Sequence, residues 1–201
     1  MGMVLALQAV SNQNIQKILE SPILIWKLIA VDDPDIYQDV LEQRSKKGFF
    51  SRWLGKKASG DQIPLEDLEI SEAEKQSEDL DKAWQGIHYC LNGTEFHAEP
   101  PMDFLTVAGK TAGDEDVGYG PARLIESGMV RAIHERIRAI TTAELRKSYD
   151  PVEMEKLDIY PDIWVRDGDE GFDYIAEYFV KLKSFVETLA KAELGMAVYL
   201  C

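Results

Sequence analysis

Apolar positions recur along most of this chain with the 3.6-residue period of a helix, so the sequence predicts a structure dominated by helices. The clearest case covers residues 80–92, which follow an acidic stretch and end at an Asn-Gly pair. One face of this helix would carry Leu80, Trp84, Ile87, His88 and Leu91. We therefore predict a helix with a tryptophan-centred apolar stripe that contains one histidine.

Further helices are predicted where a capping residue or a proline precedes an apolar repeat. They begin near residues 12, 22, 34, 118, 142, 151 and 169, and the last continues to about residue 193. Ser11 is the predicted N-cap of the first, and Thr141 forms a capping box with Glu144.

Two strands are predicted at the ends of the chain, from Met3 to Val10 and from Met196 to Leu200, because both segments are rich in apolar residues. We expect these strands to pair within one sheet. Residues 104–108 are predicted as a short strand or turn, and residues 109–117 as a loop rich in Gly, Asp and Glu.

The composition is that of one globular domain over residues 1–201, since 45% hydrophobic residues can form a substantial core. A charged stretch at about residues 43–79 is predicted to be an insertion, basic and aromatic in its first half and acidic in its second. The basic and aromatic residues are Arg44, Lys46, Lys47, Phe49, Phe50, Arg52, Trp53, Lys56 and Lys57. They could contact an anionic membrane or partner, but a solvated insertion is the favoured interpretation.

The net charge of −14 disfavours nucleic acid as a partner. Cys90 and Cys201 do not make a disulfide framework, which indicates a reducing compartment. The N-terminus lacks the features of a signal peptide, and the longest apolar run, residues 22–31, is interrupted by Lys27 and is too short to span a bilayer. We therefore expect a soluble cytoplasmic protein.

His88 is the first candidate for chemistry. Asp81 lies seven residues before it, near the edge of the same helical face, and could hold His88 as a general acid or base. A core histidine that is hydrogen-bonded to a neighbour is the favoured interpretation, because one His and one Asp specify no reaction.

A second candidate is the segment from Gly118 to Arg123, predicted to begin a helix. The backbone N–H groups of Gly118 and Gly120, together with the Arg123 cation, could bind an anion. The segment matches neither the dinucleotide fingerprint nor a P-loop, and a tight turn that needs glycine is the favoured interpretation.

Metal and cofactor chemistry finds little support in the sequence. His88, Cys90 and His97 have no metal-ligand spacing, and Cys90 is better interpreted as a small buried residue than as a nucleophile. We expect no metal and no cofactor.

Three blocks of the sequence together resemble the YfbM-like family of bacterial proteins, a domain of unknown function (DUF1877). They are residues 80–93, 118–123 and 159–164, supported by the Met-Gly-Met start and by residues 174–200. The resemblance implies a helix-rich, three-layer α-β-α sandwich around a small mixed sheet that includes both terminal strands. It implies no reaction, cofactor or catalytic residue.

The leading hypothesis is a binding or interaction domain whose groove is lined by Asp81, Trp84, His88, Tyr119 and Arg123. One alternative is an enzyme that acts on an anionic or nucleotide-like small molecule, with Arg123 holding the anion and His88 as acid or base. A further alternative is an immunity-type acidic protein that neutralises a basic partner.

Overall fold

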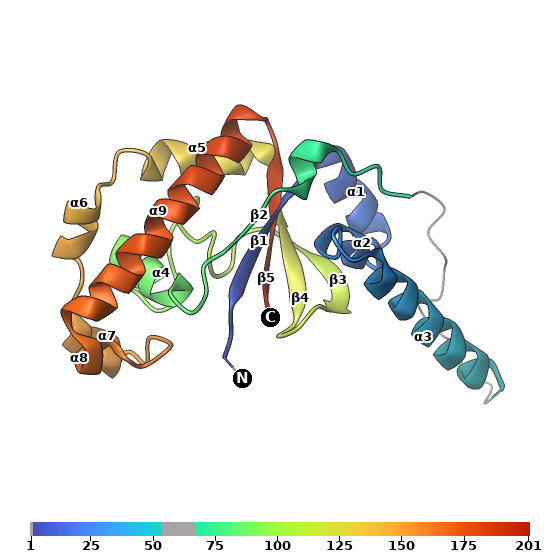
Figure 1. Cartoon of the computed structure of the whole chain (residues 1–201), viewed down its shortest axis with the longest axis horizontal. Helices are drawn as coiled ribbons and strands as arrows, with labels where there is room; N and C mark the ends of the chain where they lie inside the picture. The colour runs from blue at the N-terminus through green and yellow to red at the C-terminus, as the bar shows by residue number, and fades with distance from the viewer. Residues whose placement is uncertain (1, 54–66) are drawn as a thin grey trace.

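The computed structural model describes residues 2–53 and 67–201, without the side chains of residues 34 and 45–53. A five-stranded sheet lies between two layers of helices, as Figure 1 shows. Its strands are β1 (Leu5–Val10), β2 (Ser77–Asp79), β3 (Lys110–Asp116), β4 (Pro121–Ile125) and β5 (Gly195–Leu200), in the order β2-β1-β5-β4-β3. The predicted α/β sandwich is confirmed. Each pairing in this sheet is antiparallel, however, so the prediction of a mixed sheet is wrong in that detail.

The predicted pairing of the terminal strands is confirmed and lies inside the sheet. Strands β1 and β5 run antiparallel with six residue pairs in register, from Leu5 opposite Leu200 to Val10 opposite Gly195. Gly195 leaves no room for a side chain, since a Cβ there would lie 2.4 Å from the carbonyl oxygen of Ile125. The end of β5 is therefore closely flanked by β1 on one side and β4 on the other.

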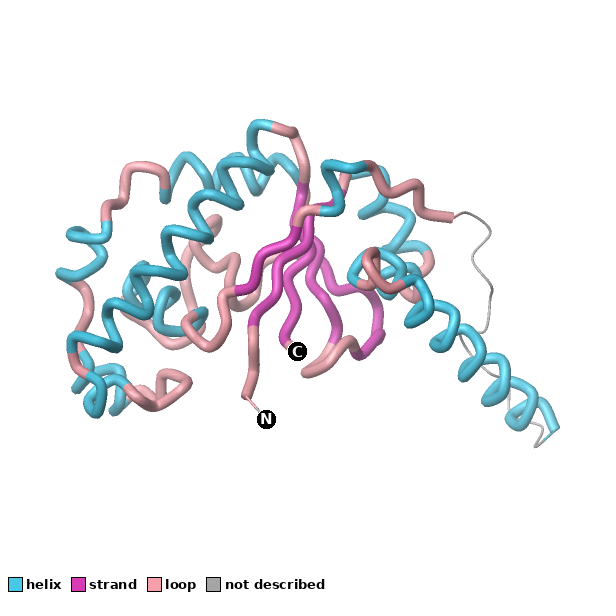
Figure 2. The backbone as a smooth tube through the Cα atoms, viewed as in Figure 1, coloured by secondary structure: helices cyan, strands magenta, loops and turns pink. Residues whose placement is uncertain are grey.

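The larger core lies between one face of the sheet and a layer of six helices. Figure 2 shows helices on both sides of the sheet. These are α4 (Trp84–Asn92), α5 (Ser127–Ile137), α6 (Thr142–Lys147), α7 (Pro151–Lys156), α8 (Trp164–Asp167) and α9 (Asp169–Lys191). Alternate strand residues such as Leu7 and Val198 point into this core, as the two-residue period of a strand requires. Trp164 and Phe179 are among its largest fully buried side chains.

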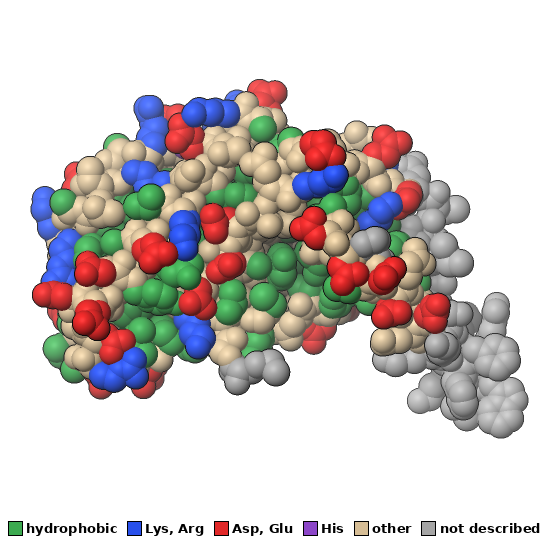
Figure 3. All heavy atoms as spheres, in the orientation of Figure 1, with side chains coloured by type: hydrophobic (Ala, Val, Ile, Leu, Met, Phe, Trp, Pro, Cys, Tyr) green, Lys and Arg blue, Asp and Glu red, His purple; other side chains and the backbone are tan. Residues whose placement is uncertain are grey.

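The opposite face carries the smaller core, covered by α1 (Asn12–Glu20), α2 (Leu24–Ile29) and the start of α3 (Pro34–Trp53). Ser11 caps α1 as predicted, because its side chain accepts a hydrogen bond from the N–H of Asn14 at 3.2 Å. Figure 1 shows α3 extending away from the body of the domain. Acidic side chains gather over α2 and the start of α3 on the face seen in Figure 3.

Strands β3 and β4 form a hairpin where the sequence predicted a loop over residues 109–117 and a helix that begins near residue 118. Both predictions are wrong. Strand β3 has a polar sequence in which Ala112 is fully buried, so it lacks the apolar alternation that marks a strand. Strand β4 alternates correctly, with Ala122 and Leu124 in the smaller core, but its five residues are too few for the period to stand out. The helix begins at Ser127 instead.

The predicted insertion at residues 43–79 is only partly a surface feature. Residues 67–79 pack against the body: Leu68 is buried, and β2 pairs with β1 at the edge of the sheet. Of the basic and aromatic set, Arg44 has a described side chain, and it is ion-paired with Glu115 of β3. The side chains of Lys46, Lys47, Phe49, Phe50, Arg52, Trp53, Lys56 and Lys57 lie outside the described residues.

Glu74, in the 3₁₀ helix η1 (Glu72–Lys75), fastens this segment to α1 through a buried carboxylate. Its Oε1 accepts hydrogen bonds from the Ser11 N–H and the Asn14 side-chain amide, both at 2.7 Å. Its Oε2 accepts from the N–H of Ser71 at 3.1 Å and from its hydroxyl at 2.8 Å. Burial alone would raise the pKa of Glu74, but the bonds from Ser11 and Ser71 outweigh it and lower the pKa below 4.5.

The substitution Glu74→Gln should lower the free energy of unfolding by about 1–3 kcal/mol, because an amide cannot accept all four hydrogen bonds and leaves buried donors unpaired. Since the folded-state pKa is depressed, the contribution of Glu74 is present above pH 4.5 and is lost as the pH falls through the folded value. Urea unfolding of wild type and variant at several pH values measures both effects.

The matched control is Glu72→Gln, whose side chain is 87% exposed and pairs with Lys75. That change should cost less than about 0.5 kcal/mol, as expected for a surface ion pair. Equal losses for the two variants would refute the role given to Glu74.

Candidate functional site

Helix α4 is confirmed, but it begins at Trp84 and not at Leu80. Leu80 still belongs to the sheet edge, since its N–H donates to the carbonyl of Leu5 at 2.9 Å. Asp81 then adopts a left-handed conformation with φ of 43°, which turns the chain into the helix. The first turn predicted from the apolar period is therefore a strand end and a turn.

Asp81 and His88 are not hydrogen-bonded to each other, so the predicted acid–base pair is absent. The Asp81 carboxylate accepts a hydrogen bond from the hydroxyl of Tyr174 at 2.9 Å, and that hydroxyl accepts from the N–H of Lys82 at 3.0 Å. Burial, with Asp81 as a second cause, raises the pKa of Tyr174. Through this hydrogen bond, Asp81 connects the turn that precedes α4 with helix α9.

His88 is fully buried in the core beneath α4. Its Nδ1 lies 3.3 Å from the side-chain nitrogen of Asn92, and its Nε2 has no partner among the described residues. Burial lowers the pKa of His88 to about 4, so the ring is neutral at neutral pH. Its complete burial favours the interpretation as a core histidine over that of a general acid or base.

The glycine turn at residues 118–120 connects β3 and β4 and does not begin a helix. The N–H groups of Gly118 and Gly120 both donate to Oδ1 of Asp116 at 3.0 Å. These two bonds lower the pKa of Asp116 and keep it ionised. The predicted anion-binding turn is therefore already occupied by a carboxylate of the chain itself.

Arg123 organises the segment between α4 and β3. Its Nη1 donates to the carbonyls of Phe104 at 3.1 Å and Ala108 at 2.5 Å, and its Nη2 donates to the carbonyl of Leu105 at 2.9 Å. Burial lowers the pKa of Arg123 to about 10, although nearby Asp103 opposes the shift, and the guanidinium stays charged at neutral pH. Its main contacts are therefore structural, which the sequence could not reveal because the three carbonyls lie in another segment.

Three of the five predicted groove residues, Trp84, Tyr119 and Arg123, line one cavity of about 200 Å³, which we call the aromatic pocket. Asp81 and His88 are not part of its wall. The other lining residues are Leu5, Phe96, Leu105, Thr106, Pro121, Val198, Tyr199 and Leu200. The structure thus brings together the aromatic and cationic members of the predicted set and separates the acid–base members from them.

Two aromatic side chains at the aromatic pocket are exposed: Tyr119 by 51% and Phe96 by 43%. The backbone of Tyr119 is fixed by its N–H, which donates to the carbonyl of Leu200 at 3.0 Å. The backbone of Phe96 is held by the Thr106 hydroxyl, which donates to the Phe96 carbonyl at 2.7 Å. Sequence reasoning missed Phe96, although a large aromatic residue in a polar loop is a usable signal.

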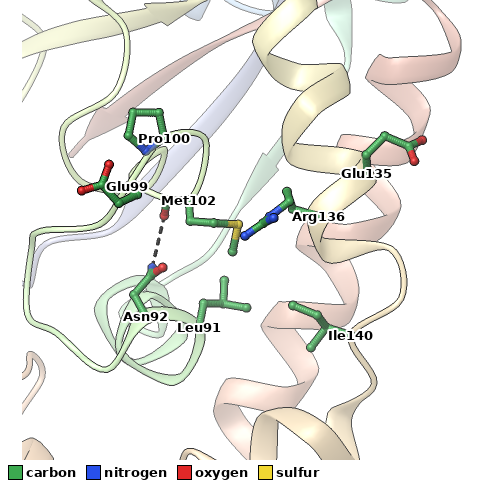
Figure 4. Close-up of a pocket in the computed structure, with 8 residues that line it drawn as sticks. All are labelled: Leu91, Asn92, Glu99, Pro100, Met102, Glu135, Arg136 and Ile140. Atoms are coloured by element: carbon green, nitrogen blue, oxygen red, sulfur yellow. Dashed lines mark hydrogen bonds between the residues drawn. The ribbon is translucent and has the colours of Figure 1, made fainter.

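A second cavity, of about 550 Å³, lies between the end of α4, the segment 99–102 and α5 (Figure 4). We call it the α4–α5 cavity. Its lining residues are Leu91, Asn92, Glu99, Pro100, Met102, Glu135, Arg136 and Ile140. The sequence did not point to it, because neither the bend of the segment 99–102 nor the position of α5 follows from local patterns.

No group of three or more potential metal ligands occurs in residues 2–53 and 67–201. Burial raises the pKa of Cys90 to about 12, so its thiol is protonated and unreactive. A membrane crossing would need a helix longer and more apolar than any in the described part of the chain.

Comparison with solved structures finds similarity to the crystal structure of YfbM, a protein of unknown function from Escherichia coli. The TM-score is 0.62 and the identity 16%, over 98% of this chain and 99% of that chain, so the similarity shows the fold alone. A search of curated proteins finds no match. The family model described as a domain of unknown function (DUF1877) matches residues 1–199. The chain therefore belongs to the YfbM-like DUF1877 family.

Proposed function

We propose that this domain is a binding module that holds a partner protein by one large apolar side chain in the aromatic pocket. The observation that carries the proposal is the pairing of a small, partly apolar cavity with exposed aromatic side chains, Phe96 and Tyr119, in its lining. Anchor residues of protein interfaces fill such pockets, and aromatic side chains are enriched around them.

The size of the pocket favours a side chain over a metabolite. Pockets for small molecules and cofactors usually measure about 300–1,000 Å³, whereas the aromatic pocket encloses about 200 Å³. That space suits one anchor side chain whose backbone remains outside. The proposal therefore concerns a partner polypeptide.

Charge near the aromatic pocket favours a basic partner segment. Asp116 lies in the same turn as Tyr119 and stays ionised, and exposed Glu95 precedes Phe96. The cation in the wall, Arg123, already donates to three carbonyls. We infer an anchor side chain flanked by lysine or arginine, since complementary charge aids encounter and selects the partner.

The enzyme alternative has less support. His88 is buried and neutral, the glycine turn binds Asp116, and Arg123 is committed to backbone carbonyls. The features assigned to acid–base chemistry and anion binding therefore serve the fold.

An acetylated lysine–tryptophan–lysine tripeptide amide should bind this protein and shift the indole N–H signal of Trp84 in ¹H–¹⁵N spectra. A lysine–serine–lysine peptide should not bind, and a glutamate–tryptophan–glutamate peptide should bind more weakly because of the nearby acids. Equal binding of the serine and tryptophan peptides would show that charge alone is recognised and would contradict the proposal.

Tyr119→Ser should lower the affinity for the tryptophan peptide by about fivefold or more, the usual effect of truncating a residue that contacts an anchor side chain. Val180→Ser is the matched control, because Val180 is 56% exposed on α9 and does not line the aromatic pocket. Calorimetric titration of both variants measures the difference. Unchanged affinity in Tyr119→Ser would count against this pocket as the site.

Peptide affinity should be the same at about pH 6 and pH 8, because the groups at the aromatic pocket keep one charge state across this range. Arg123 has a pKa of about 10 and Tyr199 of about 12, and the pKa of Asp116 in the adjoining turn is below 3.8. Titrations at both pH values check this. A tenfold change would mean that an ionisation in this window takes part in binding.

A further inference from the structure

The α4–α5 cavity presents one inward-facing charge. Figure 4 shows the Arg136 guanidinium directed toward Met102, above Leu91 and Ile140, while the carboxylates of Glu99 and Glu135 point away from it. The charged group directed into the cavity is therefore a cation, although the chain as a whole carries a charge of −14.

Arg136 is also without a counter-ion in the described part of the chain. Its neighbour Glu135 is ion-paired with Arg138, at 3.0 Å between Nε and Oε2. No ion pair or hydrogen bond is formed by the Arg136 side chain with the described residues. A guanidinium has five N–H donors in a planar fork that matches a carboxylate, so an anion in the cavity would find a partner here.

Apolar side chains and one oriented amide lie beside Arg136 in the lining, together with Glu99 and Glu135. Leu91, Met102 and Ile140 are half-buried and pack against the larger core. The Asn92 side-chain nitrogen donates to the carbonyls of His88 at 3.1 Å and Met102 at 3.2 Å. These bonds settle which end of the amide is nitrogen, and its oxygen remains free to accept a hydrogen bond from a ligand.

We propose that the α4–α5 cavity binds a small amphipathic molecule with a single carboxylate, which pairs with Arg136 while its apolar body lies over Leu91, Met102 and Ile140. A volume of about 550 Å³ suits such a ligand, since small-molecule pockets measure about 300–1,000 Å³. A phosphate, with a charge of about −1.5 to −2, fits less well, because one guanidinium must offset it beside two glutamates. This site is separate from the aromatic pocket and does not depend on the function proposed there.

The probes are 4-phenylbutyrate, 4-phenylbutylamine and 4-phenylbutanol, which share one apolar body and differ in head group. Binding to the full chain is followed by the methyl signal of Met102 in ¹H–¹³C spectra. The carboxylate should bind, and the alcohol and the amine should bind at least about tenfold more weakly, as expected when a charge-assisted hydrogen bond is lost.

The substitution Arg136→Gln should lower the affinity for 4-phenylbutyrate by about tenfold or more and leave the affinity for 4-phenylbutanol unchanged. Arg138→Gln is the matched control on α5's C-terminal cap; its side chain is 60% exposed and is paired with Glu135. That variant should retain wild-type affinity, and Arg136→Lys should retain part of it.

Three results would overturn the proposal: no binding of the carboxylate, equal binding of the amine, or full carboxylate affinity in Arg136→Gln. Unfolding curves of each variant show whether a loss comes from the site or from the fold. If Arg136→Gln is destabilised, the comparison of the three probes on wild type decides the matter by itself.

Discussion

The pairing of β1 with β5 holds this domain together, because both cores are built on the two faces of these strands. Leu7 and Val198 face the larger core, while Val10 and Ala197 face the smaller one. A slip of one residue in the register would exchange the faces and expose both sets of apolar side chains. The six pairs in register therefore position α4 and the cavities at its two ends.

Local signals in the sequence were sufficient where a few neighbouring residues decide the structure. Ser11 and Thr141 cap their helices through bonds to residues three positions away, so the helix starts could be predicted. The hairpin of β3 and β4 could not, because β3 owes its extended conformation to pairing with β4 and carries a polar sequence. Local propensity yields to tertiary context in such strands.

The candidate site shows the same division. The helical period of apolar residues predicted that Trp84 is central to a core. In the structure, Trp84 lies at the start of α4 and in the wall of the aromatic pocket. The structural roles of Arg123 and Asp81 could not be predicted from the sequence. Arg123 binds carbonyls within residues 104–108, and Asp81 binds Tyr174. Partners that distant in sequence are brought close only by the complete fold.

The segment that joins α4 to β3 contributes to both cavities. Phe96, Leu105 and Thr106 line the aromatic pocket, whereas Glu99 and Met102 line the α4–α5 cavity. Arg123 fixes the end of this segment and Asn92 fixes its middle. Two hydrogen-bonding side chains on regular elements thus give shape to a stretch that has no regular structure of its own.

The two edge strands of the sheet affect whether separate molecules of this protein associate. Strands β2 and β3 form the edges of the sheet, and an exposed edge can add a strand from another molecule. Glu78 and Asp79 on β2, and Asp114 and Asp116 on β3, place negative charge along both edges. Like-charged edges repel, so this sheet resists growth into aggregates near neutral pH. The net charge of the molecule falls toward zero as the pH approaches the isoelectric point of 4.6, and the repulsion between molecules weakens there.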